Sequence, residues 1–355
     1  MTQESTAEHT ISRVESRLGD LHQGALLVRQ RDRLGEIDAQ LGSLAQRLAQ
    51  IRLRGYAYHA HLEERLTTLA GRWPEARARA SAAIEAQVSS LQPEIDRADA
   101  AVRRVLPLKP RPLSTVEQTV RQADDAVSAA ERRIRAAESA VEGHYDALSG
   151  EVQQIAREVQ TCERVLDCLG GATFALEPGE GVVSAVEARW AEGDNAVEGI
   201  LFLTDRRLVF ERREKVARKK ILFITTASEL VKEVRWQATL ADLEQVEASE
   251  ARKALILKRE VLTVVPRAGT RASAAQFELS SDSDAWRALL LRCQSGEIAS
   301  ERSGAAPEVA EYLVPAKCPT CGGSYRQAGR IRGVSSVRCD FCGATTTLAP
   351  AAREG

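Results

Sequence analysis

The chain has 355 residues, which suggests two or three domains, and its 44% hydrophobic and 28% charged residues exclude a wholly disordered protein. The 49 basic and 50 acidic residues leave a formal net charge of -1, so no global field favours nucleic acid or membrane. No apolar run approaches the roughly 20 residues that span a bilayer, and the N-terminus lacks the apolar stretch of a secretory signal. We therefore expect a cytoplasmic protein, and the frequent arginine and alanine indicate a GC-rich, bacterial genome.

Residues 1–169 are predicted to be helical, because apolar residues recur there in steps of four and three. The clearest seam has heptad spacing and consists of Val116, Val120, Ala123, Val127, Ala130, Ile134, Ala137 and Val141. His144 and Leu148 take the next two seam positions, and the step from Leu148 to Val152 is then a stutter. The pattern predicts three long helices over about 8–70, 75–106 and 114–169.

Two proline-containing breaks separate the predicted helices. Trp73–Pro74 is expected to end the first helix, because proline disfavours the helical conformation of the residue before it. Pro107–Pro112 is expected to form a stiff turn before the third. Folding back at these turns gives a long antiparallel coiled-coil bundle.

Residues 172–296 show the alternation of short strands separated by turns. The strand candidates are 182–190, 197–204, 207–211, 221–225, 255–258, 261–265 and 276–279. Ser281–Asp284 then caps a predicted helix from Ala285 to about Gln294, with Trp286, Leu289, Leu290 and Cys293 on one face.

One strand–turn–strand segment, Gly199–Phe210, resembles the core of GRAM and bacterial pleckstrin-homology-like domains. The shared pattern is a glycine, an apolar strand, Thr204-Asp205-Arg206-Arg207-Leu208 and a second apolar strand. Leu240–Val246 and the Ser-Asp start of the last helix are similar to that family too. This sequence departs from it by an insertion, 212–231, between strands. The resemblance implies a β-sandwich or partial barrel plugged by a C-terminal helix, which binds lipid or protein.

A linker over 297–315 precedes the most specific motif of the chain. Cys318, Cys321, Cys339 and Cys342 form two Cys-x-x-Cys pairs separated by 17 residues, the spacing of a four-cysteine zinc site. The segment 316–348 resembles a small zinc ribbon. We expect one structural Zn²⁺ per chain, because four thiolate ligands leave no position open for water. A redox dithiol pair is the alternative.

A basic cluster offers a second candidate surface. Its eight cations are Arg206, Arg207, Arg212, Arg213, Lys215, Arg218, Lys219 and Lys220. A rim of this kind could meet anionic lipid headgroups, each cation contributing about 1 kcal/mol near such a surface. The competing interpretation is an ordinary charged hairpin.

Catalysis finds little support in the sequence. No Walker-A loop, dinucleotide-binding glycine pattern or nucleophile elbow is recognisable. His59 and His61 lie two apart, so on a helix they do not share a face as a metal pair would. Cys162, Cys168 and Cys293 are interpreted as packing residues.

The sequence therefore predicts a multidomain α + β protein that is not an enzyme. We expect an adaptor or scaffold that oligomerises or extends through its coiled coils and binds lipid or protein through the pleckstrin-like domain. The zinc ribbon would be a further interaction module, and protein partners and peripheral membrane contact follow from this interpretation. The alternative is a nucleic-acid-associated regulatory protein that uses the ribbon and the basic cluster.

Overall fold

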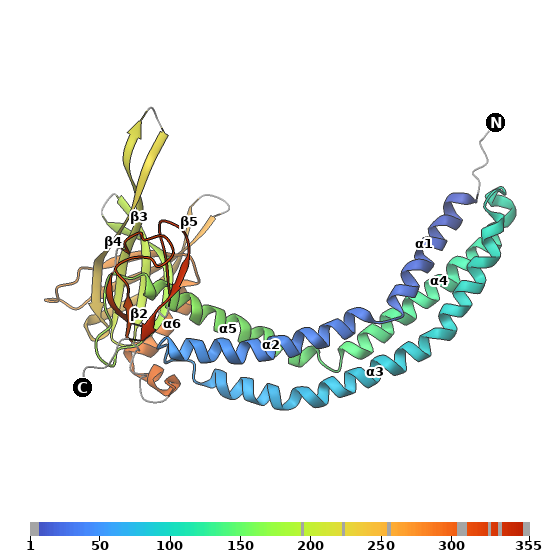
Figure 1. Cartoon of the computed structure of the whole chain (residues 1–355), viewed down its shortest axis with the longest axis horizontal. Coiled ribbons are helices and arrows are strands. Elements are labelled where there is room, and N and C mark those ends of the chain that lie inside the picture. Colours follow the sequence, from blue (N-terminus) through green and yellow to red (C-terminus); the bar gives the residue numbers. More distant parts are fainter. Residues whose placement is uncertain are drawn as a thin grey trace. The chain divides into compact units, whose positions relative to one another are not determined.

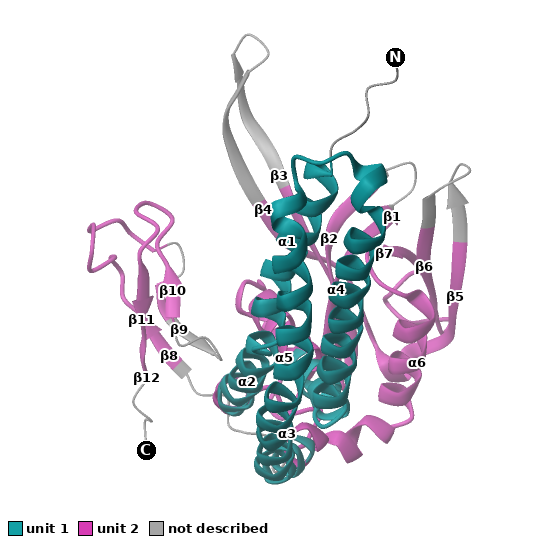
Figure 2. Cartoon of the chain, turned by 90° about the vertical axis from the view of Figure 1, so that its right-hand side faces the viewer, with its two compact units in different colours: residues 1–45, 65–156 teal, residues 46–64, 157–355 magenta. Residues whose placement is uncertain are grey.

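A computed structural model describes residues 7–192, 195–221, 224–253, 257–303, 311–325, 328–332 and 336–350. The chain begins with long helices and continues as antiparallel β-structure (Figure 1). It forms two compact units, Met1–Ala45 with Arg65–Ala156, and Gln46–Glu64 with Arg157–Gly355 (Figure 2). Among the described residues, no helix combines the length and apolar character needed to cross a membrane.

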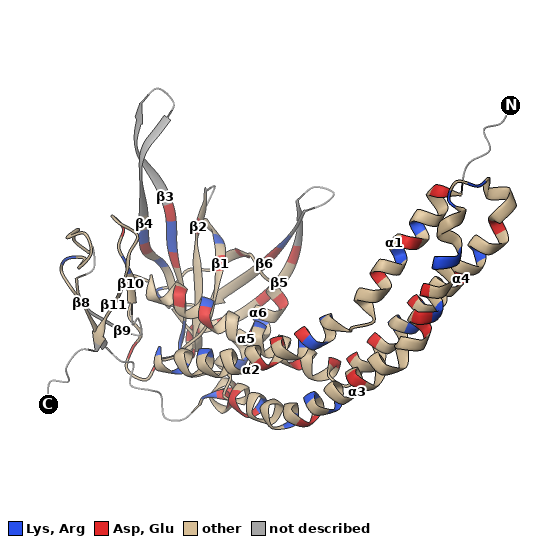
Figure 3. Cartoon of the chain, turned by 45° about the vertical axis from the view of Figure 1, so that its right-hand side comes forward, with Lys and Arg blue, Asp and Glu red and all other residues tan. Residues whose placement is uncertain are grey.

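The described part of the chain contains five long helices, where the sequence predicted three. They are α1 (Glu8–Gly24), α2 (Val28–Leu53), α3 (His61–Val105), α4 (Leu113–Glu142) and α5 (Asp146–Gly170), with the short 3-10 helix η1 (Leu106–Leu108) before α4. Acidic and basic residues are interspersed along these helices (Figure 3).

The core of the first unit is an apolar cluster from α1, α3 and α4. Its buried members are Ala7, Ile11, Val14, Leu18, Leu21, Leu91, Ile95, Ala98, Val102, Val105, Val116, Val120, Ala123, Val127, Ala130, Ile134 and Ala137. All eight predicted seam residues of α4 are buried, so that part of the periodicity is confirmed.

The predicted break at Trp73–Pro74 is wrong, because α3 runs through it from His61 to Val105. Trp73 is 5% exposed and its indole N–H donates to Asp38 on α2. Pro74 itself is exposed, so the carbonyl that loses its helical partner, that of Ala70, lies on the solvent side. Burial of the tryptophan therefore outweighs the local preference of proline.

The turn between α2 and α3 lies instead at residues 54–60. Gly55 has a φ of 92°, a left-handed conformation that glycine adopts without steric cost. The Arg52 guanidinium donates to the carbonyls of Tyr56 (2.8 Å), Tyr58 (2.7 Å) and His59 (3.1 Å). Tyr56 and Tyr58 are buried, which fixes the turn in the second unit.

The third predicted helix is divided by a turn at residues 143–145. His144 is exposed, and Tyr145 is buried in the place predicted for the histidine. From Val141 the buried positions continue through Tyr145, Leu148 and Val152. Two steps of four now follow each other at Ala137–Val141 and Val141–Tyr145, so the stutter lies at the turn before α5 and not at Leu148–Val152 as predicted.

The second unit contains a seven-stranded antiparallel sheet in the order β4-β3-β2-β1-β7-β6-β5. The strands are β1 (Val182–Glu192), β2 (Asn195–Thr204), β3 (Arg207–Ile221), β4 (Ile224–Thr239), β5 (Leu243–Lys253), β6 (Leu257–Pro266) and β7 (Ala275–Leu279), with η2 (Leu240–Asp242) between β4 and β5. In β1 the side chains of Val186, Ala188 and Trp190 are buried and those between them exposed, as expected for a strand with one covered face.

An aromatic cluster fills the centre of this sheet. Phe210 and Phe277 lie 5.4 Å apart between ring centroids, flanked by Trp190 and Trp236. A Cβ atom at Gly199 would lie 2.1 Å from the Glu211 carbonyl oxygen, so only glycine fits this strand position. Helix α6 (Ser283–Gln294) follows the sheet, with Asp282 as its N-cap and Trp286, Leu290 and Cys293 buried.

Two predictions on this half need correction. Residues 212–231 are not an insertion between strands, because they continue β3 and β4, and the candidate 221–225 falls at the junction of these strands, where 222–223 lie outside the described residues. The expected linker 297–315 begins with the 3-10 helix η3 (Glu297–Glu301) and ends in strand β8 (Glu311–Val314). The cysteine-containing module adds β9 (Gly329–Arg332), β10 (Ser336–Arg338), β11 (Thr345–Thr347) and β12 (Ala349–Pro350), in sheets ordered β12-β8-β9 and β10-β11.

Candidate metal centre

The structure brings Cys318, Cys321, Cys339 and Cys342 together, with their four sulfur atoms all within 4.8 Å of one another. The Sγ atoms of Cys318 and Cys342 are 3.8 Å apart, and those of Cys321 and Cys339 are 3.6 Å apart. These separations exceed a disulfide bond of about 2.05 Å. They match the edge of about 3.8 Å of a tetrahedron with metal–sulfur bonds of about 2.3 Å. The cluster can therefore hold a metal ion such as zinc.

Two turns with the same hydrogen-bond pattern position these cysteines. The amides of Gly322 and Gly343 donate to the carbonyls of Cys318 and Cys339, each at 2.9 Å. The amides of the two cysteines donate in turn to the carbonyls of Gly323 (2.8 Å) and Ala344 (2.9 Å). Gly322 and Gly343 have φ values of 73° and 72°, which explains why glycine follows the second cysteine of each pair.

Close packing holds the two turns against each other. A Cβ atom on Gly323 would lie 2.6 Å from a ring carbon of Phe341, so the glycine lets the aromatic ring approach. The Tyr325 hydroxyl and Thr346 Oγ1 are 2.7 Å apart, which links the first turn to β11. Phe341 remains 73% exposed, although Cys318 and Cys339 are buried.

The electrostatics of the four thiols favour a cation. For Cys318, burial acts to raise the pKa, but the backbone amides of Cys321 and Thr320 outweigh it and the pKa falls to about 6. For Cys321, the Gly323 amide acts to lower the pKa, but the neighbouring Cys342, Cys339 and Cys318 raise it to about 12. Four thiolates this close repel one another, and a divalent ion removes that repulsion.

The basic cluster is largely neutralised where its side chains are described. Arg206 pairs with Glu177, Arg207 with Glu180, Arg212 with Glu214 and Arg213 with Glu211. The carboxylates of Glu180 and Glu211 are 0% exposed, so Arg207 and Arg213 belong to buried ion pairs and do not form a rim. The side chains of Lys215, Arg218, Lys219 and Lys220 lie outside the described set, and their backbone belongs to β3.

The Thr204–Arg207 motif has a structural role in this network. The Thr204 hydroxyl donates to Glu180 (2.7 Å) and accepts from the amide of Arg207 (2.9 Å). Asp205 accepts from the Gly181 amide (3.0 Å) and from the Arg302 guanidinium (3.1 Å). The motif thus closes the β2–β3 turn and ties it to residues that precede β1 and to Arg302, which follows η3. Neither buried glutamate was predicted from the sequence.

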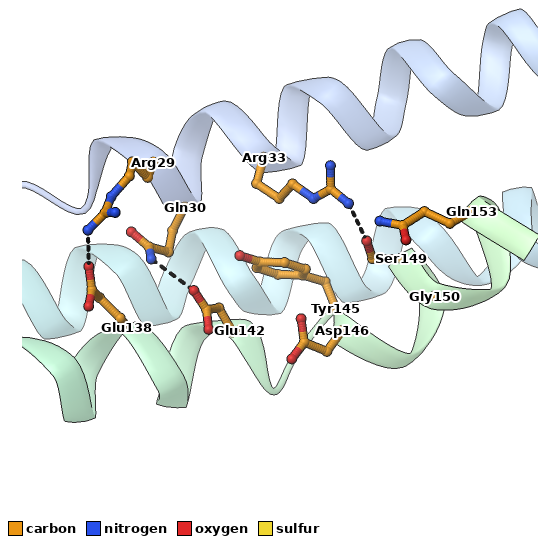
Figure 4. Close-up of a pocket in the computed structure, with 10 residues that line it drawn as sticks. All are labelled: Arg29, Gln30, Arg33, Glu138, Glu142, Tyr145, Asp146, Ser149, Gly150 and Gln153. Atoms are coloured by element: carbon orange, nitrogen blue, oxygen red, sulfur yellow. Dashed lines mark hydrogen bonds and ion pairs between the residues drawn. The ribbon is translucent and has the colours of Figure 1, made fainter. Parts of the chain in front are cut away.

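A polar groove of about 580 Å³ opens in the first unit, between the start of α2 and the turn between α4 and α5 (Figure 4). Across it Arg29 pairs with Glu138 (3.1 Å), Gln30 donates to Glu142 (3.0 Å) and Arg33 donates to Ser149 (2.7 Å). These three contacts bridge the groove at the junction between the interrupted helices, although among the described residues the buried Gln30 Oε1 has no hydrogen-bond partner.

The remaining cysteines behave as packing residues. Cys162 and Cys293 are buried, and Cys168 is partly buried. Burial raises the pKa of Cys162 to about 11 and that of Cys293 to about 12, so both are thiols at neutral pH. This environment is consistent with the prediction that these cysteines are packing residues.

No family model and no curated protein matches this chain. Among solved structures, the DH/PH fragment of PDZRHOGEF in complex with human RhoA is 13% identical, with a TM-score of 0.27, covering 76% of this chain and 95% of that one. The DH/PH domains of p115-RhoGEF (R399E mutant) are 12% identical, with a TM-score of 0.22 and coverage of 75% and 98%. The C-terminal domain of a protein from Leishmania infantum is 14% identical, with a TM-score of 0.21 and coverage of 33% and 86%. Scores this low are no basis for assigning fold, partner or activity.

Proposed function

We propose that this chain is a non-enzymatic adaptor. The helical bundle would act as a strut, the seven-stranded sheet with α6 as a pleckstrin-homology/GRAM-like binding module, and the cysteine module as a zinc ribbon. Structural Zn²⁺ on Cys318, Cys321, Cys339 and Cys342 would hold the ribbon together. The continuous apolar seam and the mutual pairing of the groove side chains support a mechanical role for the helices.

The observation that carries the proposal is the extension of β3 and β4. β2 pairs with β3 from Leu208 to Arg212, and beyond that point β3 pairs with β4 through Ile221. We call residues 213–221 and 224–232 the β-arm. Residues 215–221 contain Lys215, Arg218, Lys219 and Lys220 and no acidic residue.

This arm suits an anionic surface. Lys215, Arg218, Lys219 and Lys220 belong to the two-stranded part of the arm, beyond the residues of β3 that pair with β2, whereas Glu180 and Glu211 hold Arg207 and Arg213. Each cation near an anionic bilayer contributes about 1 kcal/mol. Removing three such cations should therefore weaken binding to the bilayer about a hundredfold. Binding through the arm would make the protein peripheral to a membrane.

Vesicle flotation with the full chain tests this function. We expect binding to vesicles of phosphatidylcholine with phosphatidylserine, weaker binding at high salt, and none to phosphatidylcholine alone. The variant R218Q/K219Q/K220Q should bind about a hundredfold more weakly. Arg207 and Arg213 stay unchanged, because neutralising them would strand buried carboxylates.

The matched control removes three cations from the exposed surface of α4, in the variant R132Q/R133Q/R135Q. It should bind anionic vesicles like the unmodified chain. Equal binding by both triple variants, or no vesicle binding at all, would contradict the role of the arm. Retention on a duplex oligonucleotide without vesicle binding would favour the nucleic-acid alternative. Light scattering of the same samples reports whether the strut also pairs with a second copy.

A further inference from the structure

A second group of metal-ligating side chains lies in the second unit, apart from the cysteines. Ligand atoms of His59, His61 and Glu301 all lie within 4.8 Å of one another. His59 Nδ1 is 3.6 Å from Glu301 Oε2, and His61 Nε2 is 3.4 Å from Glu158 Oε2. The group joins the turn before α3, the first residue of α3, the second half of α5 and η3.

The prediction that both histidines lie on one helix is wrong. The two side chains come together because only His61 belongs to a helix. His59 precedes α3 and has a φ of 59°, whereas His61 is the first residue of the helix. This left-handed residue redirects the chain, and the two rings come to 5.6 Å between centroids. A spacing of two, which separates side chains on a helix, therefore brings them together here.

The position of His59 is fixed by its surroundings. Its ring stacks on that of Tyr56 at 6.0 Å with an interplanar angle of 13°, and the Tyr56 hydroxyl donates to the Val183 carbonyl. The Ala60 amide donates to the Glu301 carbonyl (2.9 Å), and the Ser303 amide donates to the Ala57 carbonyl (2.7 Å). Left-handed φ is uncommon for a residue with a side chain, and positions held in this way often serve a function.

The charges around the group suit a divalent cation. Glu301 and Glu158 lie next to His59 and His61. The nearby cations are Arg52, which pairs with Glu63, and Arg292, which pairs with Glu297 and Glu301. Arg292 binds Glu301 through Oε1, which leaves Oε2 directed at His59. A neutral imidazole ring offers a lone pair to a metal ion.

We propose that His59, His61 and Glu301 form a second metal site, which takes a divalent transition ion of the zinc type, with the Glu158 carboxylate beside His61. Imidazole nitrogen with carboxylate oxygen is a donor set suited to zinc. Ligand bonds of about 2.0–2.1 Å place tetrahedral ligand atoms about 3.3 Å apart, close to the 3.6 Å between His59 Nδ1 and Glu301 Oε2. The side chains of His59 and His61 are 33% and 41% exposed, so an ion can reach them from solvent.

Native mass spectrometry of the full chain in the presence of Zn²⁺ alone tests the site. The unmodified chain should hold two zinc ions, one on the cysteines and one here. The variant H61Q should hold one, and so should H59G, which keeps the left-handed turn because glycine adopts it freely. The control H144A, which changes an exposed histidine outside the group, should hold two.

A cysteine variant separates the two sites. C318S/C321S should retain one zinc ion through the histidines, and its combination with H61Q should retain none. Circular dichroism of each variant verifies that the helices are intact. Saturation of the unmodified chain at one ion, or uptake of two ions by both H61Q and H59G, would overturn the proposal.

Discussion

The two compact units bury different kinds of groups. The apolar cluster of the first unit is aliphatic throughout, and its ion pairs, such as Arg17 with Glu131, stay at the surface with side chains 27% exposed. The second unit encloses the carboxylates of Glu180 and Glu211 and collects four thiols in its cysteine module. The first unit therefore depends on many similar apolar contacts, whereas the second unit adds buried carboxylates and clustered thiols to an aromatic core.

The largest expected effect follows from removal of one thiol. C339S should abolish protection from amide hydrogen exchange over 311–350, because a module of this size cannot fold without its metal. The helices of the first unit should keep theirs. Mass spectrometry of exchanged peptides measures both at once.

A chelator should reproduce this loss in the unmodified chain, and added Zn²⁺ should reverse it there but not in C339S. Unchanged protection of 311–350 in the variant would contradict a metal-dependent module.

Breaking a buried ion pair should have the next largest effect. E180Q leaves Arg207 without its carboxylate, and removal of one partner of a buried pair costs about 3–5 kcal/mol of unfolding free energy. Urea unfolding followed by tryptophan fluorescence measures this, since Trp190, Trp236 and Trp286 all lie in the second unit. A loss below 1 kcal/mol would place the stability of the sheet elsewhere.

The same pair predicts a dependence on pH. Burial acts to raise the pKa of Glu180, but hydrogen bonds from Arg207, the Glu177 amide and Thr204 outweigh it and lower the pKa below its ordinary value of 4.5. A lowered pKa stabilises the fold above the unfolded-state value, and this contribution is lost as the pH falls through the folded-state value. The difference between the unmodified chain and E180Q should therefore shrink below about pH 4.5. A difference that stays constant down to pH 3 would exclude this role for Glu180.

In the first unit, truncating one buried side chain should lower the unfolding free energy less than removing a zinc ligand disrupts the cysteine module. L91A creates a cavity in the apolar cluster, where Leu91 is 0% exposed, and should lower the unfolding free energy by about 3 kcal/mol. L26A, at a side chain that is 51% exposed, should cost less than about 0.5 kcal/mol. Hydrogen exchange of α1, α3 and α4 reports both, and equal effects would mean that the cluster is not the core.

The smallest effect is expected at the surface of the bundle. R17Q removes contacts to Glu131 and Asp124, and exposed pairs of this kind contribute about 0–1 kcal/mol. Thermal unfolding at low and high salt should show a small difference that salt reduces further. A large, salt-independent loss would show that the first unit also depends on a single polar contact.

The regular elements were the predictable part of this molecule. The seam of α4 repeats over several turns, so one-dimensional spacing suffices to find its buried face. Trp73–Pro74 was misjudged because a local rule for proline competes with tertiary burial of the indole, which spacing does not reveal. His144 and Tyr145 exchanged roles because the turn before α5 shifts the register by one residue.

The candidate sites divide in the same way. The cysteine cluster was predictable because its spacing is written in the sequence and its geometry is local. The sequence identifies the cations of residues 215–220. It does not reveal that Arg207 and Arg213 pair with buried glutamates, because that pairing depends on how distant strands align. The meeting of His59 with Glu301 requires a left-handed residue and a contact between distant segments, and neither has a recognisable signature.

The interruptions of the bundle have a mechanical consequence. The break between α1 and α2 lies beside α4, where Gly24 faces Ile134, whereas the turn between α4 and α5 lies beside α2, where Gln30 donates to Glu142 and Arg33 to Ser149. The two interruptions are therefore staggered, and α3 runs beside α2 there without a break, as its Glu85 pairs with Arg31. Under a tensile load along the first unit, we expect the backbone hydrogen bonds of two helices to share the force at each interruption.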